Sequence, residues 1–87
     1  MTNRMPATAI LTMATIIKDA EDSHGYLVVS AKWLGRVENG YRYAFYALKK
    51  SDVTGENEDA FFVASHNYVN GIRYKPMSAT EFYANED

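Results

Sequence analysis

The 87-residue sequence predicts an α+β fold, with a four-stranded, mainly antiparallel sheet, an N-terminal helix and a short C-terminal helical turn. Polar residues recur at helical spacing near the N-terminus. Further along, Asn39-Gly40 and Asn70-Gly71 each separate two runs of apolar and aromatic residues. Asn-Gly between such runs is the strongest short-range signal for a β-hairpin. The length fits a single domain over residues 1–87.

The first element is predicted to be a helix over residues 7–20. Its polar residues recur at spacings of four, three and four: Thr8, Thr12, Thr15 and Asp19. This spacing leaves one apolar side, and Pro6 suits the first turn of a helix. Ile and Thr also favour strands, so an alternative makes residues 8–18 a fifth strand and the fold a small five-stranded all-β barrel.

Two Asn-Gly hairpins follow the helix. Their four predicted strands cover residues 26–38, 41–50, 60–69 and 72–75. Pro76 ends the last strand because proline cannot donate to a sheet ladder. Between the hairpins, residues 51–59 have the polar composition of a surface loop.

The chain ends are predicted to add little to the core. Residues 1–6 are expected to form a loose arm, and residues 84–87 an acidic tail. Before the tail, Ser78 and Glu81 stand at the spacing of a capping box, which predicts a helical turn through Tyr83.

A two-residue loop at Asn39-Gly40 would place Trp33 opposite Tyr46 and sort the side chains of the first hairpin onto two faces. One face is mostly apolar: Val29, Ala31, Trp33, Val37, Ala44, Tyr46 and Leu48, with Arg42 near the turn. It is the predicted core, packed against the helix through Ile10, Met13 and Ile17. The other face mixes aromatic and basic residues: Lys32, Leu34, Arg36, Tyr41, Tyr43, Phe45 and Lys49.

The second hairpin repeats this segregation. A two-residue loop at Asn70-Gly71 would pair Tyr68 with Arg73. One of its faces is again aromatic and basic: His66, Tyr68, Arg73 and Lys75. The two aromatic and basic faces are predicted to stay open to a partner.

Composition excludes several classes of protein. A net charge of −2 argues against a general nucleic-acid binder, which is usually strongly basic. With no cysteine, disulfides, thiol catalysis and Cys-ligated zinc sites are excluded, and a reducing cytoplasm is the expected location. The apolar run at residues 7–17 is too short to span a bilayer, so no membrane association is expected.

The sequence predicts no catalytic, cofactor-binding or metal-binding residue. His24 and His66 are the two histidines, and neither stands at ligand spacing from a carboxylate or another histidine on a shared element. Ser65 and His66 are neighbours on a predicted strand, so their side chains point to opposite faces. No Gly-x-Ser-x-Gly elbow or phosphate-binding glycine loop is present.

The aromatic and basic face is therefore the predicted functional surface. We expect a small non-enzymatic interaction protein that binds and modulates or inhibits a larger protein partner. The alternatives are a single-stranded nucleic-acid-binding module that stacks bases on this face, a homodimer that buries it, and a face that is simply a second packed layer of the fold. The predicted partner-binding residues are Lys32, Arg36, Tyr41, Tyr43, Phe45, Tyr68 and Arg73.

Overall fold

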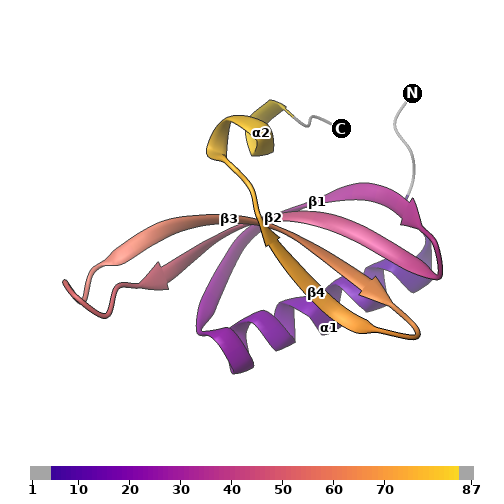
Figure 1. Ribbon diagram of the computed structural model, residues 1–87, viewed down its shortest axis with the longest axis horizontal. Coiled ribbons are helices and arrows are strands. Elements are labelled where there is room, and N and C mark those ends of the chain that lie inside the picture. The colour runs from indigo at the N-terminus through magenta and orange to yellow at the C-terminus, as the bar shows by residue number, and fades with distance from the viewer. Residues whose placement is uncertain (1–4, 85–87) are drawn as a thin grey trace.

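The computed structural model, described here for residues 5–84, has a four-stranded antiparallel sheet with one helix on each face (Figure 1). The strands lie in chain order, so each pairs with the next. This confirms the α+β prediction, and the barrel alternative is wrong because residues 8–18 are helical. The elements are α1 (Ala7–His24), β1 (Tyr26–Val37), β2 (Gly40–Lys50), β3 (Asn57–Asn67), β4 (Gly71–Pro76) and α2 (Ala79–Ala84).

Helix α1 is one turn longer than predicted. It ends where Gly25 takes the left-handed conformation, at φ 72°, and donates its N–H to the carbonyl of Ala20. Its fully buried residues are Ala9, Ile16 and Ala20. Ile10 was predicted to face the core but is 50% exposed, because it lies about 100° around the helix from Ala9.

The first hairpin turn is one residue earlier than predicted. Val37 pairs with Gly40, so the two turn residues are Glu38 and Asn39, and Asn39 takes a φ of 60°. Gly40 instead begins β2. A Cβ atom there would overlap the carbonyl oxygen of His66, so glycine is required by the close approach of β3.

Strand β1 contains two further irregularities. Its register shifts between Val28 and Ser30 and again between Trp33 and Gly35. The earlier turn and the shift beside Gly35 together pair Trp33 with Tyr43 and not with Tyr46. A bulge of this kind moves the following side chains to the other face of the sheet, so the predicted division of β1 between the two faces is wrong.

The second hairpin has a three-residue loop. Asn67 pairs with Gly71, which leaves residues 68–70 in the loop, and Gly71 takes a φ of 79°. This arrangement is a common alternative to the predicted two-residue turn. It pairs His66 with Ile72, so the predicted register was wrong here too.

These registers decide which face α1 covers. The helix packs on the face that carries Tyr41, Tyr43 and Phe45, and all three side chains are at most 5% exposed. The hydroxyl of Tyr43 donates a 2.6 Å hydrogen bond to the carbonyl of Ala9 in α1. Of the predicted core face, Ala31 and Trp33 do pack on the α1 side, as do Met13 and Ile17 of the helix. Its β2 residues Ala44, Tyr46 and Leu48 face away from α1, contrary to expectation.

The polar loop between the hairpins is shorter than predicted. Strand β3 begins at Asn57, so the loop covers residues 51–56. Lys49 lies directly opposite Glu58 across the two strands. Opposite charges in such a cross-strand pair are stabilising, which explains why this polar segment pairs.

Helix α2 begins with the predicted capping box. The N–H of Glu81 donates to Ser78 Oγ at 3.0 Å, and the N–H of Ser78 donates to a carboxylate oxygen of Glu81 at 3.4 Å. Phe82 then packs against Tyr46 and Phe61 and is 2% exposed. α2 thus covers part of the sheet face opposite α1 (Figure 1).

The predicted terminal segments fall partly outside the described residues. Met5 packs against the core, whereas residues 1–4 of the predicted arm and residues 85–87 of the predicted tail are not described. Within residues 5–84, no helix combines the length and apolar character needed to cross a membrane.

Candidate functional site

The seven predicted partner-binding residues do not share one surface. Tyr41, Tyr43 and Phe45 lie beneath α1, so the expectation that their face stays open was wrong. Arg36 is on the same side of the sheet, with its guanidinium 5.8 Å from the centre of the Tyr41 ring. Because α1 occupies this face, a second copy of the chain cannot pack its sheet against it.

Lys32 lies on the opposite face, where it holds α2 in place. Its ammonium donates a 2.6 Å hydrogen bond to the carbonyl of Phe82 and lies 4.2 Å from the centre of the Phe82 ring. A cation at the carboxyl end of a helix is favoured by the partial negative charge there. Lys32 is therefore already engaged within the chain.

Tyr68 lies in the loop of the second hairpin and is 63% exposed. A hydrogen bond between its side chain and that of Tyr41 lowers the pKa of Tyr41 and raises the pKa of Tyr68. This loop therefore stands on the α1 side of the sheet. Of the predicted residues, Arg73 is an exposed cation on the other side.

That other side carries the candidate site, which we call the basic face and define as Arg42, Val63, Ser65, Arg73 and Lys75. Arg42, Ser65 and Arg73 are direct neighbours across β2, β3 and β4. Val63 and Lys75 form the next cross-strand pair on this face of the sheet. Adjacent strands lie about 4.8 Å apart, so the backbones that carry the two arginines are about 10 Å apart.

Two depressions open on the basic face, and both are lined by Arg42 and Ser65. One, of about 310 Å³, lies toward the hairpin turns and is lined by Val37, Glu38, Arg42, Ser65, Asn67, Asn70, Gly71 and Arg73. The other, of about 270 Å³, lies toward α2 and is lined by Arg42, Val63, Ser65, Lys75, Pro76, Met77 and Glu81.

The three cations of the basic face outnumber the two carboxylates that line the same depressions, Glu38 and Glu81. Arg42, Arg73 and Lys75 are exposed, and none of them forms an ion pair with another residue between 5 and 84. The ion pairs of this part of the chain, Lys18–Asp22 and His24–Asp19, belong to α1. The basic face thus offers positive charge beside an apolar strand surface.

On this side of the sheet Tyr46 and Phe61 are half-buried, whereas Tyr83 of α2, which contacts Phe61, is 59% exposed. Tyr46 and Phe61 stack with their centres 4.9 Å apart, and Phe82 of α2 lies over both. Tyr46 donates a 2.8 Å hydrogen bond to Asp59, and this bond raises the pKa of Tyr46. The rings therefore belong to the packing of α2 and not to the surface beside the arginines.

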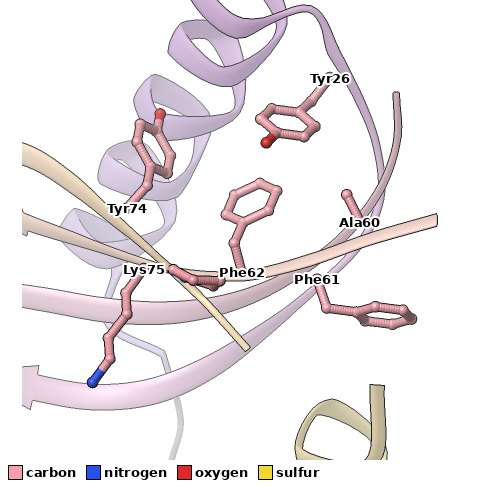
Figure 2. Close-up of a pocket in the computed structure, with 7 residues that line it drawn as sticks. Tyr26, Ala60, Phe61, Phe62, Tyr74 and Lys75 are labelled. Atoms are coloured by element: carbon pink, nitrogen blue, oxygen red, sulfur yellow. The ribbon is translucent and has the colours of Figure 1, made fainter. Parts of the chain in front are cut away.

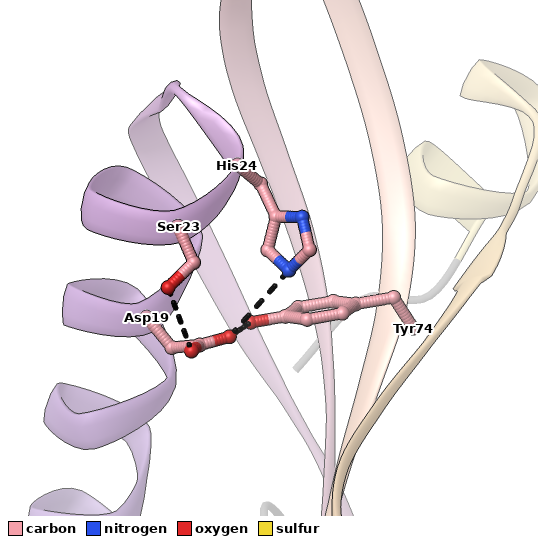
Figure 3. Close-up of polar contacts among 4 residues, drawn as sticks. All are labelled: Asp19, Ser23, His24 and Tyr74. Atoms are coloured by element: carbon pink, nitrogen blue, oxygen red, sulfur yellow. Dashed lines mark hydrogen bonds and ion pairs between the residues drawn. The ribbon is translucent and has the colours of Figure 1, made fainter.

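A second polar cluster joins the end of α1 to β4 (Figure 3). Tyr74 donates a 2.6 Å hydrogen bond to Asp19. Burial is the main cause that raises the pKa of Tyr74, and this hydrogen bond raises it further. Ser23 donates to the other oxygen of Asp19 at 3.3 Å, while His24 Nε2 lies 3.7 Å from the carboxylate. Since Ser23 bonds the carboxylate and not the imidazole, the cluster is a structural link and not a nucleophile–base pair.

A small pocket of about 160 Å³ lies where β4 ends (Figure 2). Its lining consists of Tyr26, Ala60, Phe61, Phe62, Tyr74, Lys75 and Pro76. The side chains of Tyr74 and Lys75 leave β4 on opposite sides of the sheet, as Figure 2 shows. The pocket is mainly aromatic and lies beside the outer strand.

Sequence reasoning placed Lys75 on the same face as Arg73 but did not count it among the partner-binding residues, and it missed Arg42 as their neighbour. A signal was present, because Arg42 was the one cation on a face otherwise predicted to be apolar core. The pairing of Arg42 with Ser65, and of Ser65 with Arg73, depends on strand registers. No family model, curated protein or solved structure matches this chain.

Proposed function

We propose that this chain is a non-enzymatic interaction protein that binds an acidic surface of a larger protein through the basic face and thereby modulates that protein. One observation carries the proposal: Arg42, Arg73 and Lys75 stand exposed around Val63, without ion pairs in residues 5–84. Charge complementarity steers association, and arginine is enriched among the residues that dominate binding energy.

The position of the aromatic rings favours a protein partner over single-stranded nucleic acid. Modules that bind single strands stack bases on exposed aromatic side chains beside a positively charged groove. Here Tyr46 and Phe61 are half-buried beside Phe82, and the exposed ring of Tyr83 lies against Phe61 and near Lys32. These rings belong to the α2 end of the sheet and do not stand between the arginines. The net charge of −2 also favours a protein partner.

A cytoplasmic location is part of the proposal. It is supported by the lack of cysteine in all 87 residues, because small extracellular domains commonly depend on disulfides.

The test compares two charge reversals by fluorescence anisotropy with an acidic peptide. Arg42→Glu alters the basic face, and Arg36→Glu makes the same change on the α1 side of the sheet. We expect Arg42→Glu to weaken binding at least about tenfold, because like charges across an interface cost several kcal/mol. Arg36→Glu is expected to leave binding unchanged.

The same titration with a single-stranded oligonucleotide of equal charge separates the alternative. Tighter binding to the oligonucleotide, falling steeply with salt, would replace the protein partner with nucleic acid. Equal losses in both variants would show that net charge, and not the basic face, determines binding.

A further inference from the structure

We infer that the outer edge of β4 accepts an extended segment of the partner as a fifth strand, and that this segment alternates acidic and apolar residues. The inference rests on the proposed function and specifies how the partner is recognised. Adding a strand to an open sheet edge is a common mode of peptide binding, in which backbone hydrogen bonds give affinity and alternate side chains give specificity.

The edge of β4 is regular and open. The strand pairs with β3 over six consecutive residue pairs without a register shift. On its other side no strand of residues 5–84 pairs with it. In an antiparallel sheet, every second residue of such a strand directs its backbone groups outward. Because the N–H of Met77 donates to the carbonyl of Phe61, these residues are Ile72, Tyr74 and Pro76, and Pro76 offers only its C=O.

The opposite edge of the sheet is a poorer template. Strand β1 has two register shifts, and Gly35 beside the second has a φ of 107°. Bulges increase local twist and interrupt the ladder, which protects an edge strand from pairing. Strand addition is therefore assigned to β4.

The two sides of β4 define the chemistry of the added strand. Arg73 and Lys75 are exposed on the basic face, while Ile72 and Tyr74 are half-buried on the α1 side. Side chains directly opposite each other on adjacent strands lie about 5 Å apart at Cβ. Acidic side chains would thus meet Arg73 and Lys75, and the apolar side chains between them would meet Ile72 and Tyr74.

The small aromatic pocket adds to the apolar side. It is lined by Tyr74, Phe62 and Tyr26, and it adjoins the end of β4 (Figure 2). An apolar side chain placed opposite Tyr74 would therefore lie at the rim of this pocket.

A second copy of the chain is a poor occupant of the same edge. Antiparallel pairing of two β4 strands would bring Arg73 and Lys75 of one copy against those of the other. Like charges directly opposite each other on adjacent strands are destabilising. The charges of β4 therefore select an acidic segment.

The experiment uses a peptide of about eight residues that alternates Glu and Val, which is long enough to span β4. Two further peptides carry backbone N-methyl groups on all Glu or on all Val residues, so each has one blocked edge. Binding to the full chain is measured by anisotropy, and amide shifts are followed by NMR. We expect one methylated peptide to lose at least about tenfold in affinity while the other still binds, since losing several backbone hydrogen bonds exceeds that factor.

We also expect the amide signals of residues 71–76 to shift, whereas those of β1 stay in place. Equal affinity of both methylated peptides, or loss by both, would overturn strand addition at a single edge. If binding nevertheless depends on Arg42, the basic face remains the binding surface. If none of these peptides binds, and Arg42→Glu also leaves binding of the acidic peptide in the first test unchanged, the proposed function itself fails.

Discussion

The hydroxyl of Tyr43, in the second strand, donates a 2.6 Å hydrogen bond to the carbonyl of Ala9, in the first turn of α1. Both residues are fully buried. This bond joins the central part of the sheet to the helix and shows which face of the sheet is the interior. It lies in the layer where Tyr41, Tyr43 and Phe45, three of the aromatic residues predicted to meet a partner, are buried under α1.

Replacing this tyrosine with phenylalanine should destabilise the fold. Tyr43→Phe removes one buried hydrogen bond and keeps the ring, so we expect a loss of about 1 kcal/mol in the free energy of unfolding. Urea titration measures it. Tyr83→Phe is the matched control, because Tyr83 is 59% exposed, and its effect should stay within about 0.5 kcal/mol. Equal effects of the two substitutions would contradict the role given to the Tyr43 hydroxyl.

Stability should fall at alkaline pH. Burial raises the pKa of Tyr43 from 10.0 to about 12, so the folded state favours the neutral phenol. A raised pKa contributes stability that is fully present below pH 10 and is lost as the pH rises through 12. The loss should be of the order of 2 kcal/mol.

The measurement is the free energy of unfolding below pH 10 and between pH 10 and 12, for the natural chain and for Tyr43→Phe. The free energy of unfolding of the variant should fall less steeply with pH. Part of the fall should persist in the variant, because burial also raises the pKa of Tyr74. Parallel declines would argue against Tyr43 as a source of the alkaline dependence.

The two glycines that follow the hairpin turns, Gly40 and Gly71, should differ sharply in their tolerance of a methyl group. Gly40→Ala would place Cβ against the backbone carbonyl of His66, which cannot move without separating β2 from β3. We expect a cost of about 3 kcal/mol or more, at the upper end of overpacking effects. Gly71→Ala meets open space at a φ of 79°, so its cost should be about 1–2 kcal/mol of backbone strain. Thermal unfolding of both variants shows which substitution destabilises the fold more. A larger loss for Gly71→Ala would contradict the claim that the close approach of β3 requires glycine at position 40.

Removing the charge of Lys32 should release α2. Lys32→Met keeps the apolar stem but loses the hydrogen bond to the Phe82 carbonyl and the cation–π contact, which together contribute about 1–2 kcal/mol. Amide exchange of residues 79–84 should become faster while the sheet stays protected. Lys49→Met is the control, since the exposed Lys49 ammonium lies 5.0 Å from the centre of the Tyr26 ring and does not contact α2. Unchanged exchange in Lys32→Met would mean that Phe82 alone holds α2.

Much of the fold could be predicted because its signals are local. The helical spacing of Thr8, Thr12, Thr15 and Asp19 outweighed the strand preference of their neighbours, and the Ser78–Glu81 capping box forms as expected. The candidate site was harder to predict. It depends on Arg42, Ser65 and Arg73 being neighbours across three strands, and no local pattern states which residues become neighbours.

The sequence by itself determined the type and order of the elements, because helical periodicity, strand composition and turn residues act over a few positions. Only the tertiary structure decided which face is interior. Side chains alternate along a strand, so a change of one residue in register moves every following side chain to the other face. Gly40 is in β2 because β3 approaches it, and the earlier turn together with the register shift beside Gly35 places Trp33 opposite Tyr43. Contacts between distant segments, and not the turn residues, therefore placed the aromatic residues under α1 and the arginines in the open.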